Sequence, residues 1–181
     1  ARSETARGNA VQSYLVDLFS ANSNDQKNAI QVRNLNAKQL LDRGVQKLEA
    51  TTGVHVDVDI ALFRLFGTLY ENLGESETSK RLHQRSVSAA EAAHGKESMQ
   101  YAQAILELAW VESYGQLGRR IDLIEQAEKI LRRVAPTSEL MIQALNYEAT
   151  SVSQSDPARA AKAASESLRL LARYEGSYKL K

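Results

Sequence analysis

Residues 62–74 read LFRLFGTLYENLG, and residues 106–118 repeat the pattern as LELAWVESYGQLG. In both copies a large apolar residue stands four positions before a tyrosine, and both copies end on Leu-Gly. These apolar–tyrosine pairs are Phe66–Tyr70 and Trp110–Tyr114. Side chains four apart lie on one face of a helix, so each pair predicts half of an apolar stripe. The final glycine predicts the end of that helix, because glycine can adopt the left-handed conformation of a capping residue.

The remaining sequence predicts further helices and no strand. The chain has 181 residues, of which 43% are hydrophobic. Only two of its residues are prolines, which favours long helices. Helix starts near residues 57, 97 and 137 recur at about 40 residues, a period typical of repeated helical pairs. We therefore expect an all-α fold, an α-solenoid of about four antiparallel helical hairpins. The expected helices cover residues 3–21, 37–50, 57–73, 75–93, 97–117, 119–134, a segment that starts at 137, and 157–174.

The expected domain organisation has two parts. Residues 1–52 form an N-terminal helical hairpin with a polar loop at 22–35, and residues 53–181 form the repeats and a C-terminal capping helix. Thr137 and Asp156 are expected to cap helix starts, since a short polar side chain can accept from the first turn. His94-Gly95 is expected to end a helix.

Composition excludes several classes of function. The net charge of +1 provides no field that would attract nucleic acid. The absence of cysteine excludes thiolate chemistry, thiolate metal sites and disulfides. No apolar run is long enough to span a bilayer, so we expect no membrane insertion by this segment. Because the chain begins at Ala1 without methionine, we expect a piece of a longer protein or a processed form.

The two copies resemble the tetratricopeptide repeat family. The first copy matches through Phe63, Phe66, Gly67, Tyr70 and Gly74, with Ser79 and Ser86 at the small sites of the following helix. The second copy matches through Trp110, Tyr114 and Gly118, although Val111 replaces a glycine, and a degenerate third copy covers residues 145–168. The resemblance implies a right-handed superhelix that holds a protein or peptide ligand in its concave groove.

The segment before the repeats resembles a narrower group. Residues 9–19, NAVQSYLVDLF, and residues 40–44, LLDRG, are similar to the region between the membrane helix and the repeats in bacterial receptor-type serine/threonine kinases. This resemblance implies the sensory or regulatory tail of a larger bacterial signalling protein. The tail would be extracytoplasmic (periplasmic) if a transmembrane helix lies upstream, and cytoplasmic otherwise. No kinase signature occurs in the 181 residues, so any kinase activity would lie outside this chain.

Helical geometry predicts which residues line the groove, because they lie off the apolar stripe of the first helix in each pair. These residues are Arg64, Thr68, Glu71 and Asn72, then Leu108, Glu112 and Gln116, then Asn146, Thr150 and Gln154. The lining is polar and contains one arginine. The cationic clamp that some family members use for C-terminal carboxylates is therefore mostly missing, and chaperone tails are poor candidates.

No residue pattern predicts a catalytic, cofactor or metal site. His55, Asp57 and Asp59 alternate as in a strand and fit a helix start instead, where acids favour the positive end of the dipole. His83 is expected to be a partly buried packing residue. Trp110 is expected to be a core residue whose truncation costs about 3–5 kcal/mol. The basic pairs are expected to be solvated helix faces; they are Arg119-Arg120 and Arg132-Arg133.

Three functions compete on this sequence. The first is a protein-binding module that docks a protein or peptide, and the second is a scaffold that self-associates and brings attached effector domains together. The third is an enzyme, which lacks any acid–base or nucleophile constellation here. Sedimentation separates the first two, since self-association requires a homo-oligomer.

Overall fold

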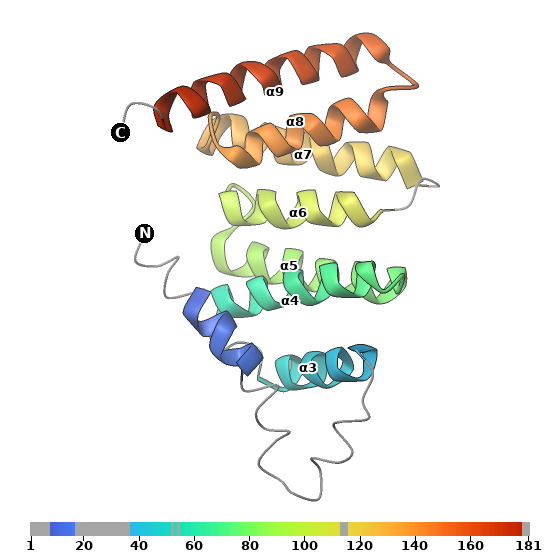
Figure 1. The fold of residues 1–181 in the computed structure, drawn as a ribbon, viewed down its shortest axis with the longest axis vertical. Coiled ribbons are helices and arrows are strands. Elements are labelled where there is room, and N and C mark those ends of the chain that lie inside the picture. The colour runs from blue at the N-terminus through green and yellow to red at the C-terminus, as the bar shows by residue number, and fades with distance from the viewer. Residues whose placement is uncertain (1–7, 17–36, 52, 54, 113–115, 179–181) are drawn as a thin grey trace, which may run out of the picture. The chain divides into compact units, whose positions relative to one another are not determined.

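A computed structural model describes residues 8–16, 37–51, 53, 55–112 and 116–178 (Figure 1). These residues form helices and the turns between them, with no β-strand in the ranges given, which confirms the all-α prediction. Residues 8–16 are helical. The labelled helices are α3 (Ala37–Thr51), α4 (Val56–Asn72), α5 (Ser76–His94), α6 (Met99–Val111), α7 (Leu117–Val134), α8 (Glu139–Val152) and α9 (Pro157–Tyr178). Helix α3 packs against α4, and α6, α7, α8 and α9 each pack against the next, as in a helical-repeat-like fold.

The chain divides into two compact units, residues 1–89 and residues 90–181, and the division falls within α5. The predicted boundary between residues 52 and 53 and the predicted right-handed superhelix stay predictions. The predicted polar loop at 22–35 lies outside the described residues.

Unit 1 is organised around the aromatic residues of α4. Phe66 and Tyr70 are buried, which confirms the predicted stripe of the first copy. The Tyr14 ring meets Phe66 edge-on with centroids 6.3 Å apart, and the Tyr14 hydroxyl donates to the Gly44 carbonyl at 2.6 Å. The Tyr70 hydroxyl donates to the Asp42 carboxylate on α3. These contacts tie residues 8–16, α3 and α4 into one core.

The contact between α4 and α5 depends on Gly67. A Cβ built on Gly67 would lie 2.6 Å from Nε2 of His83, whose side chain is buried. Real Cβ atoms do not approach that closely, so the imidazole occupies the space that a side chain at position 67 would need. The prediction that His83 is a packing residue is confirmed, and its burial is nearly complete.

Two glycines end helices as predicted, whereas a third glycine lies inside a helix. Gly74 and Gly95 have φ of 77° and 75°, and the Gly74 N–H donates to the Glu71 carbonyl at 2.8 Å. The prediction that Gly118 ends a helix is wrong, because Gly118 lies in the first turn of α7. The preceding helix, α6, stops at Val111, and Glu112 has an extended backbone with ψ of 128°. Tyr114 lies outside the described residues.

Polar caps fix the helix starts of unit 2. Ser138, and not the predicted Thr137, caps α8: its Oγ accepts from the Met141 N–H at 3.2 Å. Ser98 caps α6 in the same way. Asp156 Oδ1 accepts from the Arg159 N–H at 2.9 Å, which confirms the predicted cap of α9.

The core of unit 2 is aliphatic. Its fully buried side chains include Ile105, Leu106, Ile124, Leu131, Met141 and Leu145. Among the helices that the structure describes, none combines the length and the apolar character needed to cross a membrane.

Candidate partner-binding face

The four residues predicted on α4 lie at the surface of unit 1. Thr68 and Asn72 are exposed, whereas Arg64 and Glu71 are half-buried. The Thr68 hydroxyl donates to the Arg64 carbonyl one turn earlier, at 3.2 Å. Burial first, and then the charge of Arg64, lowers the pKa of His83 to about 4. The imidazole is therefore neutral at physiological pH.

Of the residues predicted to face outward on α6 and just after it, Leu108 and Glu112 do not, whereas Gln116 does. Leu108 is buried. Glu112 is only 2% exposed, and its Oε1 accepts from Arg119 Nε at 2.9 Å. Arg119, which donates this bond, lies in the first turn of α7. Gln116 is exposed and directly precedes α7.

A different line of residues faces outward on α6. Met99 and Trp110 are each 45% exposed, and Gln103 and Glu107 between them are half-buried. Positions 99, 103, 107 and 110 lie on one side of a helix. The prediction that Trp110 is a core residue is wrong. The core side of α6 is occupied by Ala102, Ile105 and Ala109 instead.

Trp110 is held in place by neighbours from two other helices. Its ring stacks on that of Tyr147 from α8, with centroids 4.9 Å apart and an interplanar angle of 28°. The guanidinium carbon of Arg120, from α7, lies 5.2 Å from the Trp110 ring centroid. The Tyr147 hydroxyl accepts from Gln143 Nε2 at 2.8 Å. The indole is thus both solvent-accessible and fixed.

The third set of predicted residues is exposed. Asn146 and Thr150 on α8 reach solvent, and so does Gln154 in the turn after α8. Asn146 also contacts α9, since its Oδ1 accepts from the Ser167 hydroxyl at 2.7 Å. The Thr150 hydroxyl donates to the Asn146 carbonyl at 2.8 Å. Thr150 shares the outward side of α8 with Gln143 and Tyr147.

These residues define one surface, which we call the aromatic face. It consists of Met99, Gln103, Glu107, Trp110, Gln143, Tyr147 and Thr150. The face offers an aromatic stack, a thioether and amide or hydroxyl groups, and Glu107 is its one charged member. Such a surface suits the apolar side chains and backbone amides of a bound peptide or helix. It contains no acid–base pair for catalysis.

The prediction that the basic pairs are solvated holds for Arg119, Arg132 and Arg133, whose side chains are 58%, 49% and 51% exposed, and it is wrong for Arg120, which is 5% exposed. Arg119 pairs with Glu112, and Arg120 is buried against Trp110. Arg132 pairs with Glu166 on α9, and Arg133 pairs with Glu97. Asp59, from the predicted helix start, accepts from the Gly53 N–H at 2.7 Å. In the described parts of the chain, no three His, Asp or Glu side chains are placed to hold a metal ion.

A sequence signal for the aromatic face does exist. Gln103 and Glu107 are polar residues four apart in the otherwise mostly apolar segment 99–111. Polar positions at that spacing indicate the solvent side of a helix, and position 110 continues the same line. Aligning Trp110 with Phe66 of the first copy concealed this signal, because Phe66 is buried.

Comparisons with known proteins support the fold alone. No family model matches the sequence, and no curated protein matches it. The crystal structure of BtubC (BKLC) from P. vanneervenii is similar to this chain with a TM-score of 0.64, at 14% sequence identity. The match covers 93% of this chain and 72% of that chain.

Proposed function

We propose that this chain is a protein-binding module and that the aromatic face of unit 2 contacts the partner. The observation that carries the proposal is Trp110, which is 45% exposed and yet packed against side chains of α7 and α8. Tryptophan and tyrosine are enriched among the residues that dominate the binding energy of protein interfaces, and Trp110 and Tyr147 lie together here. A side chain that is already ordered loses little conformational entropy on binding.

The finer part of the proposal rests on the sequence resemblances. The helices act as tetratricopeptide-like hairpins, and the chain serves as the regulatory tail of a larger bacterial signalling protein, such as a serine/threonine kinase. Any catalysis belongs to a part of that protein outside these residues. The tail is extracytoplasmic if a membrane helix precedes it.

The proposal is tested by photo-crosslinking followed by titration. A benzophenone amino acid replaces Gln143 on the aromatic face or, as a matched control, the exposed Lys129 on α7. A protein that crosslinks from position 143 and not from position 129 is identified, and its affinity for the chain is measured. Trp110→Ala should weaken that affinity at least about tenfold, since interface tryptophans contribute about 2 kcal/mol or more.

The control for this titration is Leu168→Ala on α9, which removes a side chain that is 67% exposed and distant in sequence from the face. Its affinity should equal that of the wild type. Arg64→Glu tests the α4 surface of unit 1 in the same assay. Loss of affinity in Arg64→Glu but not in Trp110→Ala would place the partner on α4 and remove the aromatic face from the proposal.

The alternative function is a self-associating scaffold. Sedimentation of the isolated chain at tens of micromolar distinguishes it, because a scaffold must form a homo-oligomer there. A monomer excludes the scaffold, whereas an oligomer that dissociates in Trp110→Ala would make a second copy the partner of the face.

A further inference from the structure

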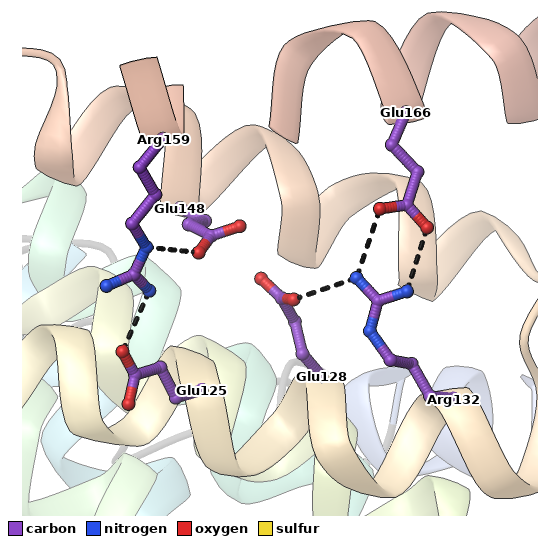
Figure 2. Close-up of polar contacts among 6 residues, drawn as sticks. All are labelled: Glu125, Glu128, Arg132, Glu148, Arg159 and Glu166. Atoms are coloured by element: carbon purple, nitrogen blue, oxygen red, sulfur yellow. Dashed lines mark hydrogen bonds and ion pairs between the residues drawn. The ribbon is translucent and has the colours of Figure 1, made fainter. Parts of the chain in front are cut away.

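A chain of acidic and basic side chains links three helices of unit 2 (Figure 2). Arg132 on α7 donates to both carboxylate oxygens of Glu166 on α9, at 2.8 and 3.1 Å, and to Glu128 Oε2 on its own helix at 3.4 Å. Arg159 on α9 donates to Glu148 Oε1 on α8 at 2.6 Å and lies 2.8 Å from Glu125 Oε1 on α7. Two guanidinium groups therefore serve four carboxyl groups.

Glu128 is the member of this network that lacks sufficient donors. Its side chain is buried, and no N–H or O–H group of the described residues donates to its buried Oε1. Among acidic neighbours, Glu148 raises the pKa of Glu128 most, through its charge and through side-chain hydrogen bonding. Figure 2 shows the Glu148 carboxyl group next to that of Glu128. A buried acceptor without a donor is costly, and two adjacent carboxylates repel one another.

A single added proton resolves both problems. On either carboxyl group it creates an O–H donor for the neighbouring oxygen, and it removes one of two like charges. We infer that Glu128 and Glu148 form a proton-binding site, in which one proton is shared at and below neutral pH and is released to solvent in mildly basic solution, loosening the packing of α7, α8 and α9.

The surroundings of the pair are consistent with this site. Burial, and next the charge of Glu148, raises the pKa of Glu128 to about 7, and Arg132 opposes the rise. The charged groups that face the pair are Glu125 and Arg132 from α7 and Arg159 and Glu166 from α9. The Tyr101 hydroxyl on α6 accepts a hydrogen bond from Gln126 Nε2 on α7 at 3.4 Å.

The sign of the effect follows from the direction of the shift. A group whose pKa is raised on folding contributes stability that is complete below its unfolded value, here 4.5, and is lost as pH rises through the folded value. Unit 2 should thus become less stable between pH 6 and pH 8.5, even though Arg132 and Arg159 keep their charges over that range.

A direct test is carbon-13 NMR of the full chain labelled at the glutamate side-chain carboxyl carbons. In the wild type, the carboxyl resonance assigned by substitution to Glu128 should titrate with a midpoint near pH 7, whereas the reference value for a glutamate side chain is about 4.3. This measurement needs no variant to fold for the titration itself to be observed. If no glutamate carbon of the wild type titrates between pH 6 and pH 8, the shared proton does not exist.

A second test measures the stability of unit 2 as a function of pH. The urea midpoint of unit 2 should fall by about 1 M between pH 6 and pH 8.5 in the wild type. Glu128→Gln supplies a permanent N–H donor and removes one charge, so its midpoint should be flat over this range. Glu125→Gln is the matched control, since it alters an exposed member of the same network and should keep the wild-type slope. An unchanged slope in Glu128→Gln would overturn the inference.

Discussion

Gly67 and His83 show how one residue pair fixes the distance between two helices. Because a Cβ at position 67 would meet the imidazole at 2.6 Å, α4 and α5 pack at a separation that only glycine permits. Glycine inside a helix costs about 1 kcal/mol relative to alanine. The close approach that it allows offsets this cost, since His83 and the surrounding aromatic side chains are buried there.

Gly67→Ala should change the free energy of unfolding in opposite directions in the wild type and in a His83→Ala background. Gly67→Ala in the wild type should lower the free energy of unfolding by about 1–2 kcal/mol, because overpacking outweighs the gain in helix propensity. In a His83→Ala background the steric conflict is absent, and the same substitution should stabilise by about 1 kcal/mol. Urea unfolding of the four proteins of this cycle measures both effects. Equal effects in the two backgrounds would show that the imidazole does not set the separation.

At the scale of the element, helix starts are fixed by single side chains. Ser138 satisfies the free Met141 N–H at the start of α8, whereas the neighbouring Thr137 is exposed and does not cap it. Ser138→Ala should therefore cost about 1 kcal/mol, and Thr137→Ala should cost less than half of that. Thermal unfolding followed by circular dichroism compares the two. A larger loss of stability in Thr137→Ala would show that Thr137 caps α8, as the sequence predicted.

The two copies also show which elements a sequence can predict. In the first copy everything needed is local: Tyr70 lies on the apolar stripe and Gly74 follows it with a positive φ. In the second copy the same Leu-Gly dipeptide begins a helix, because α6 has already ended beside Glu112. That carboxylate is buried against Arg119, a contact between two helices that no local pattern contains.

At the scale of the whole molecule, the helical hairpins could be predicted from period and caps, but the polar networks could not. The Arg132–Glu166 and Arg159–Glu125 pairs join residues on different helices, so their geometry exists only after the helices pack. The aromatic face depends on the same packing, since Trp110 and Tyr147 come from α6 and α8. Sequence periodicity indicates which side of a helix is polar, and it does not indicate which polar groups meet.

The two units should respond to pH in opposite directions. The pKa of His83 in unit 1 is lowered to about 4, so its contribution to stability is complete above pH 6.5 and is lost as pH falls toward 4. This loss amounts to about 3 kcal/mol. Unit 2 instead loses stability at basic pH through Glu128. Hydrogen exchange, corrected for intrinsic rates, should show α4 and α5 losing protection at pH 5 and α7 to α9 losing it at pH 8.5.

His83→Gln and Glu128→Gln are the controls for this experiment. Each should abolish the pH response of its own unit and leave that of the other unaltered, because the two groups lie in different units. If both units lost protection in the same direction, a global effect of net charge would replace the two local causes.

The contact of Gly67 with His83 also constrains how this sequence can diverge. Position 67 cannot accept a larger residue while His83 is kept, since a side chain at position 67 requires a smaller one at position 83. Among descendants of this protein the two positions should therefore change together, with glycine opposite a large residue or alanine opposite a small one. The second copy has Val111 at the glycine position, so it does not share the requirement for glycine.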